Sequence, residues 1–175
     1  MLSSIARGAA AGAAGTTALH AATYLDMTLR GRPSSSTPQQ TVDKLSEATD
    51  TSIPGDEETQ ENRKSGLGAL LGMVTGTTVG VGYGALHKWG WRPPMLVGAV
   101  VATVSAMVGS NAPMTVLGVT DPRTWSTSDW LSDILPHLAY GLVTAATYGL
   151  MENGRTRTPP LRNRRKNKKA RALPR

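Results

Sequence analysis

The 175-residue chain contains no cysteine and no phenylalanine, and it has only four tryptophans and four tyrosines. Without cysteine there is no disulfide framework and no thiolate for catalysis or metal binding. Its three histidines, His20, His87 and His137, are widely spaced, and the sequence has no glycine-rich phosphate loop, nucleophile elbow or HExxH run. These absences predict a protein that is not an enzyme and that binds no metal and no other cofactor.

Charge is scarce outside the C-terminal tail. Residues 152–175 hold ten basic residues and one acid, Glu152, whereas the rest of the chain holds nine basic and eleven acidic residues. The formal net charge of +7 therefore reflects the tail and not the body of the protein. Because the tail has no apolar periodicity, residues 154–175 are predicted to form a disordered basic cytoplasmic segment.

Four stretches lack Asp, Glu, Lys and Arg altogether: residues 8–25, 65–86, 93–120 and 134–151. A helix needs about 17–25 mostly apolar residues to cross a bilayer, and all four stretches are long enough. The sequence predicts an all-α integral membrane protein, a four-helix bundle with glycine-rich helix packing. One alternative is a soluble bundle rich in alanine and glycine. In another, the first stretch is a cleaved secretory signal with Arg7 as its basic region.

Start and stop signals divide the chain into segments. The first transmembrane helix is expected over residues 1–30, capped by Ser3 or Ser4 and ended by Gly31. A polar extracytoplasmic loop follows over residues 31–64. Its short helix, about residues 38–49, is expected to have Thr37 as N-cap. The remaining transmembrane helices are expected over residues 65–87, 93–112 and 126–153, and the last of them is expected to be capped by Ser126 and Asp129. An apolar return segment and turn is expected over residues 113–125, after a break at Pro113.

Glycine recurs at every fourth position of the second predicted membrane helix, the strongest regular pattern in the chain. In lipid, small residues drive helix association because they allow backbones to approach closely. This set is predicted to form a glycine zipper against small residues on other helices, such as Gly8 and Gly12. Its members are Gly68, Gly72, Gly76, Gly80 and Gly84.

Ionisable and amide side chains inside a membrane are costly, so each one is a candidate site. Asp133 and His137 lie four residues apart on one helix face, where a carboxylate beside an imidazole can relay protons. Capping of the helix start by Asp133 is the simpler interpretation. The candidate intramembrane polar site, an outer cavity, comprises His20, Asp26, Asn111, Asp133 and His137.

The basic tail is expected to contact anionic lipid head groups. Nucleic acid is a less favoured partner, since no aromatic residue is interleaved for base stacking. Thirteen Lys and Arg residues lie on the side of the two termini and six on the other side, which predicts that both termini are cytoplasmic. The tail residues expected to contact lipid are Arg162, Arg164, Arg165, Lys166, Lys168, Lys169 and Arg171.

In two segments the chain resembles small multi-spanning membrane proteins of actinobacteria. These segments are AATYLDMTLRGRPSSSTP over residues 21–38 and NAPMTVLGVTDPRTW over residues 111–125. The resemblance covers residues 5–152 and implies location and fold, because no activity is assigned to that group. We therefore expect a non-enzymatic protein of a bacterial plasma membrane, a structural or accessory subunit with a membrane protein partner or a second copy of itself. The alternatives are a small transporter or channel using the polar cavity, and a membrane-tethered binder of nucleic acid or acidic partners.

Overall fold

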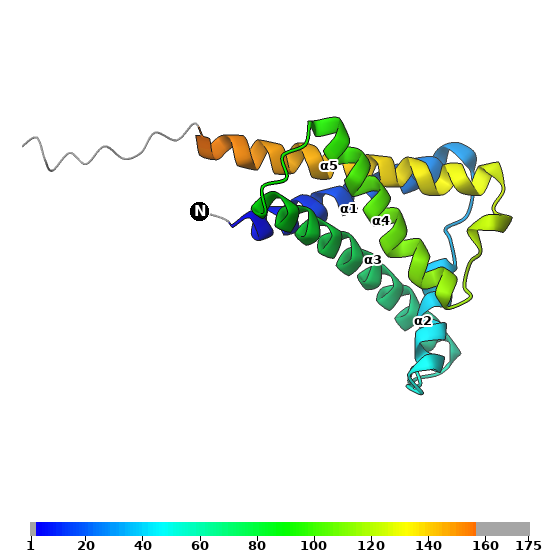
Figure 1. Ribbon diagram of the computed structural model, residues 1–175. Helices are drawn as coiled ribbons and strands as arrows, with labels where there is room; N and C mark the ends of the chain where they lie inside the picture. The colour runs from blue at the N-terminus through cyan, green and yellow to red at the C-terminus, as the bar shows by residue number, and fades with distance from the viewer. Residues whose placement is uncertain (1–2, 157–175) are drawn as a thin grey trace, which may run out of the picture.

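The structure, a computed structural model, describes residues 3–156, and within that range the chain forms helices, turns and loops but no strand. The elements in chain order are α1 (Ser4–Arg30), α2 (Thr37–Ala48), α3 (Glu57–Lys88), α4 (Met95–Val116), the 3-10 turn η1 (Pro122–Thr124) and α5 (Thr127–Thr156). The predicted all-α class is confirmed, and the long helices form a bundle (Figure 1).

Helix α1 is the central element of this bundle. It packs against both α3 and α5, while α4 packs mainly on α5 and α2 packs on α3 (Figure 1). Gly8 lies against Gly84, and Gly12 lies against Gly80, so α1 and α3 run antiparallel. Alternate long helices therefore run in opposite directions, and the start of α1, the end of α3 and the end of α5 lie at one end of the molecule (Figure 1).

Local signals set both ends of α1 and the start of α5 as the sequence predicted. The Ser3 side chain accepts a hydrogen bond from the Ala6 backbone N–H, and α1 stops at Gly31 in the left-handed conformation. Ser126 and Asp129 cap the start of α5 reciprocally: the Ser126 backbone N–H donates to the Asp129 carboxylate, and the Asp129 backbone N–H donates to the Ser126 hydroxyl. At α2 the N-cap position is occupied by Ser36, one residue before the predicted Thr37.

Pro113 does not end α4, which corrects the prediction of a break there and of a return segment from residue 113. The helix runs through Pro113 to Val116, because proline removes one backbone hydrogen bond but keeps a helical φ. The true stop is Gly118, whose φ of +71° lets the chain turn back. The Gly118 N–H then donates to Thr115 and the Val119 N–H to Met114, which satisfies the last carbonyl groups.

The interior of the bundle consists of small and aromatic residues, whereas the large aliphatic side chains lie outside. Buried hydrophobic residues on the long helices are Ala11, Tyr83, Ala99, Ala102, Ala106, Tyr140, Ala145 and Tyr148. Exposed ones include Leu70, Val74, Leu96, Val100, Val104, Leu131, Leu135 and Leu142. Three helices within residues 3–156, namely α3, α4 and α5, are long and apolar enough to cross a membrane. The predicted first span, α1, is not among these three.

Candidate functional site

Three of the five predicted polar site residues meet between α4 and α5. The Asn111 side-chain amide donates to the Asp133 carboxylate at 3.0 Å, and the Asp133 carboxylate lies 3.4 Å from His137 Nδ1. His137 is buried, and its Nδ1 lies 2.7 Å from the Asp133 carbonyl oxygen while its Nε2 lies 3.3 Å from the Ser110 hydroxyl. We call Ser110, Asn111, Asp133 and His137 the α4–α5 polar cluster. Both histidine nitrogens and the carboxylate have partners inside it.

The other two predicted site residues are placed elsewhere. Asp26 forms ion pairs with Arg30 and Arg32, and the Arg30 guanidinium also donates to the hydroxyls of Ser128 and Ser132 on α5. This network joins the end of α1 to the start of α5. The recorded ring contact of His20 is with Tyr24, one turn along α1, at 6.3 Å between centroids. The structure thus brings Asn111, Asp133 and His137 into contact. The ion pairs of Asp26 and the ring contact of His20 are with other residues, and the shared outer cavity stays a prediction.

Glycines bring the backbones of α1 and α3 into direct contact. A Cβ atom added at Gly80 would lie 2.5 Å from the Cα of Gly12, and one added at Gly84 would lie 3.0 Å from the Cα of Gly8. Real Cβ atoms do not approach other atoms as closely as 2.5 Å, so only glycine fits at position 80 in this arrangement. This contact fixes how deeply α1 sits in the bundle.

Gly76 belongs to the same face of α3 but meets side chains instead of backbone. The Thr16 hydroxyl of α1 occupies the space where a Cβ of Gly76 would stand. The buried Tyr140 hydroxyl of α5 donates to the Gly76 carbonyl at 2.6 Å. Position 76 is thus the point where α1, α3 and α5 meet, at the middle of α3.

The remaining two members of the glycine series face other directions. Gly68 lies against Pro38 of α2, and nothing lies within 4 Å of a Cβ placed at Gly72. An α-helix turns 100° per residue, so a four-residue repeat advances by about 40° at each step and by about 160° over the series. Because α3 also diverges from α1 towards its N-terminal end, one straight neighbour cannot contact all five glycines (Figure 1).

A second buried group lies at the opposite end of the bundle, where sequence reasoning placed only surface charge. Arg7, Tyr83, His87 and Tyr148 are all less than a tenth exposed. The Arg7 guanidinium lies 5.4 Å from the centroid of the Tyr148 ring, and the centroid of the His87 imidazole lies 4.2 Å from the same point. The Tyr83 ring stands edge-on to Tyr148 at 5.4 Å. We call these four residues the Arg7 cluster.

Polar atoms of the Arg7 cluster are incompletely paired. Arg7 Nη2 donates to the Ser4 hydroxyl at 3.0 Å, but Arg7 Nε and Nη1, His87 Nε2 and the Tyr148 hydroxyl are buried without a hydrogen-bond partner. The nearby Glu152 carboxylate is ion-paired with Arg92 and lies 3.7 Å from His87 Nδ1. No sequence spacing signals this group, because its members come from three helices that are distant in the chain.

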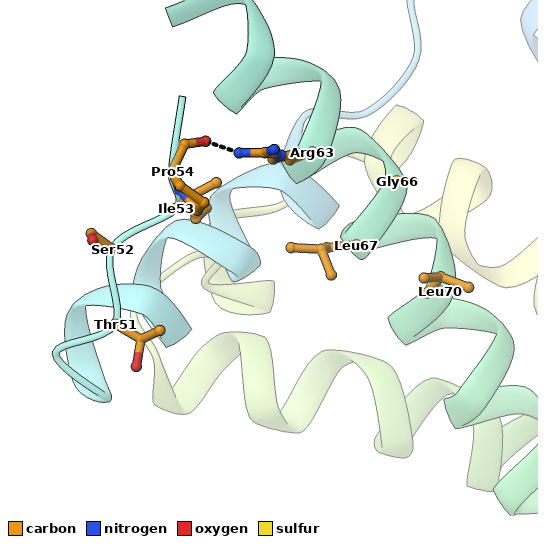
Figure 2. A pocket seen from close by; sticks show the side chains of 8 residues that line it. All are labelled: Thr51, Ser52, Ile53, Pro54, Arg63, Gly66, Leu67 and Leu70. Carbon is orange, nitrogen blue, oxygen red and sulfur yellow. Dashed lines mark hydrogen bonds between the residues drawn. The ribbon is translucent and has the colours of Figure 1, made fainter. Parts of the chain in front are cut away.

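An open apolar groove lies at the other end of α3. Its volume is about 500 Å³, and its floor is formed by Leu67 and Leu70. Figure 2 shows Leu67 facing the loop over residues 51–54, and the Arg63 guanidinium donates to the Pro54 carbonyl, which ties this loop to α3. A smaller depression on the same helix is lined by Met73, Val74, Thr77 and Thr78. None of the predicted polar site residues lines either hollow.

Within residues 3–156 no group of three His, Asp or Glu side chains could hold a metal ion. The seven tail residues predicted to contact lipid lie outside the described residues. Comparison of the chain with known proteins found no matching family model, no matching curated protein and no matching solved structure. The resemblance to actinobacterial membrane proteins therefore stays a prediction.

Proposed function

We propose that the chain is a non-enzymatic integral protein of a bacterial plasma membrane, with a structural or accessory role in a membrane complex. One observation carries the proposal: large aliphatic side chains lie outside while alanine, glycine and threonine lie inside. A soluble helix directs such aliphatic side chains inward and a charged face outward. Lipid tails are as apolar as leucine, so outward-facing leucine and valine carry no cost there.

We include α1 as a fourth span. Its first half packs against α3, and its contacts with α5 extend from Arg7 to Arg30, so it shares their environment if they cross a bilayer. Tryptophans support this placement at both ends of the bundle. Trp89 is 80% exposed in the turn after α3, and at the other end Trp125 stands edge-on to Trp130 of α5, with 5.0 Å between the ring centroids. Tryptophan is enriched at the two membrane–water interfaces.

The proposed orientation places both termini in the cytoplasm. Arg7, Lys88 and Arg92 share the end of the bundle from which the chain leaves towards its basic C-terminal residues, and an excess of Lys and Arg marks the cytoplasmic side. A reporter that is active only in the cytoplasm should work when fused after Arg175 and fail when inserted at Ser35. The opposite pattern would reverse the orientation, and release of the protein from membranes by alkaline carbonate would refute membrane integration.

The accessory role is supported by the unoccupied face of α3. Gly72 is exposed, and nothing lies within 4 Å of a Cβ placed there, so this part of the α3 surface is open. A small residue on a lipid-facing helix allows another helix to approach. After mild detergent extraction, a co-purifying partner or second copy should be lost with Gly72→Leu and kept with Thr78→Leu, which changes an exposed position on another face of α3. Retention with both changes would contradict a partner at this face.

Proton or cation transport is the second candidate function, favoured by the meeting of Asn111, Asp133 and His137 across two helices. A carboxylate beside an imidazole in a membrane is a recurring element of proton pathways. Liposomes containing the wild-type protein should then dissipate a pH gradient faster than liposomes containing Asp133→Asn. Equal rates, no faster than in empty liposomes, would leave the cluster with a packing role.

A further inference from the structure

The Arg7 cluster combines buried positive charge with hydrogen-bond donors that lack acceptors. Both unpartnered Arg7 atoms, Nε and Nη1, carry N–H groups and can only donate. His87 Nε2 is also buried without a partner, whereas Nδ1 lies 3.4 Å from Arg92 Nη1 and 3.7 Å from the Glu152 carboxylate. The Tyr148 hydroxyl is a further unpartnered donor. All these donors belong to one stack around the Tyr148 ring.

Nothing else in residues 3–156 supplies the missing acceptors. The Ser4 hydroxyl receives only Arg7 Nη2. The Glu152 carboxylate is the nearest anion, and its oxygens face Arg92 and His87 Nδ1. Burial of a donor without an acceptor destabilises the folded state, most of all for a charged group, so several together are unusual in a folded protein. The α4–α5 polar cluster shows the contrast, because its histidine nitrogens and carboxylate are internally paired.

We infer that the Arg7 cluster is a binding site for one phosphate group. A phosphate carries negative charge and several acceptor oxygens, so one group can receive bonds from a guanidinium, a hydroxyl and an imidazole N–H together. Arginine suits this role because its planar guanidinium donates in a fixed geometry to phosphate oxygens. The aromatic rings of Tyr83 and Tyr148 exclude water around the charge pair and strengthen it.

The position of the cluster indicates where the phosphate comes from. It lies at the end of the bundle that carries Lys88, the exposed Trp89 and Arg92, which are typical of the head-group region. On the proposed membrane placement, which this step depends on, a phospholipid phosphate lies at the same depth. The same donors would also bind inorganic phosphate from solution, so the experiment separates these two sources.

Thermal unfolding in mild detergent tests the site, since a ligand that binds the folded state raises the melting temperature. The probes are short-chain phosphatidylglycerol, short-chain phosphatidylcholine and sodium phosphate at matched ionic strength. Stabilisation of the wild type by both lipids but not by sodium phosphate would identify a lipid phosphate. Stabilisation by sodium phosphate as well would identify a site open to the free ion. No stabilisation by any probe would overturn the inference.

Three variants show whether this cluster is responsible. Arg7→Gln should weaken binding of the stabilising probe at least tenfold, and Tyr148→Phe, which keeps the ring and removes one hydroxyl, about threefold or more. Lys88→Gln removes an exposed charge at the same end and should bind like the wild type. An equal loss of affinity for the probe in Arg7→Gln and Lys88→Gln would indicate diffuse charge attraction and overturn the proposed site. Unchanged affinity in Tyr148→Phe would overturn it as well. Resistance of the same variants to extraction from membranes by alkaline carbonate tests the proposed membrane placement separately.

Discussion

The contact between α1 and α3 is most sharply tested at Gly80. A Cβ at this position would lie 2.5 Å from the Cα of Gly12 and 2.7 Å from its backbone nitrogen. Both atoms belong to the α1 backbone, so no side chain can rotate away and the two helices must separate. Gly80→Ala is therefore expected to destabilise the bundle although it is the smallest change available at this position.

Two matched controls come from the same helix. A Cβ at Gly72 or at Gly82 would meet no atom within 4 Å. Replacing glycine by alanine in a helix contributes about 0.5–1 kcal/mol of stability in each case, because alanine loses less conformational entropy on folding. This contribution is common to all three variants and cancels when they are compared, so the comparison isolates the clash with α1.

Overpacking of a well-packed interior costs about 1–3 kcal/mol. For a domain of this size, 1 kcal/mol corresponds to roughly 2–4 °C in melting temperature. Gly80→Ala should therefore melt at least about 2 °C below Gly72→Ala and Gly82→Ala, as followed by circular dichroism in one mild detergent. The two controls should equal or exceed the wild type. Three equal melting temperatures would refute the backbone contact, and with it the placement of α1 in the bundle.

Three further predictions concern other parts of the molecule. Tyr140→Phe removes the hydrogen bond to the Gly76 carbonyl while it keeps the buried ring, so it should lower the free energy of unfolding by about 1 kcal/mol; a stability equal to the wild type would show that this bond contributes nothing. Asp133→Asn and His137→Gln each disrupt the same polar cluster, so the double variant should be less destabilised than the sum of the singles in a double-mutant cycle, whereas strict additivity would separate the two residues. The hydrogen bonds that Asp56 accepts from Thr59 hold the pKa of its carboxyl below the usual value, so this cap is present at neutral pH and is lost as the pH falls through the lowered pKa. The protection of the Thr59 amide from hydrogen exchange, measured relative to the intrinsic exchange rate at each pH, should be lost below that pKa in the wild type. In Asp56→Ala this protection should be absent at every pH.

Local features of this protein could be predicted because they depend on neighbouring residues in the chain. Contacts within four residues set the two ends of α1, at Ser3 and Gly31, and the start of α5, at Ser126 and Asp129. Sequence spacing encodes such contacts. The uncharged runs likewise predicted the three apolar helices α3, α4 and α5. Pro113 misled the prediction because proline excludes a hydrogen bond but not a helical φ, and Gly118 supplied the stop instead.

Only the tertiary structure decided which residues meet across helices. The rotation of α3 directs Gly80 and Gly84 at α1, Gly68 at α2 and Gly72 outward, although the four are equivalent in the sequence pattern. The same packing buries Arg7 against Tyr148, a residue 141 positions away in the chain. A four-residue repeat fixes spacing along one helix, but burial and pairing depend on the rotation and depth of each neighbour, which the sequence of a single helix does not contain.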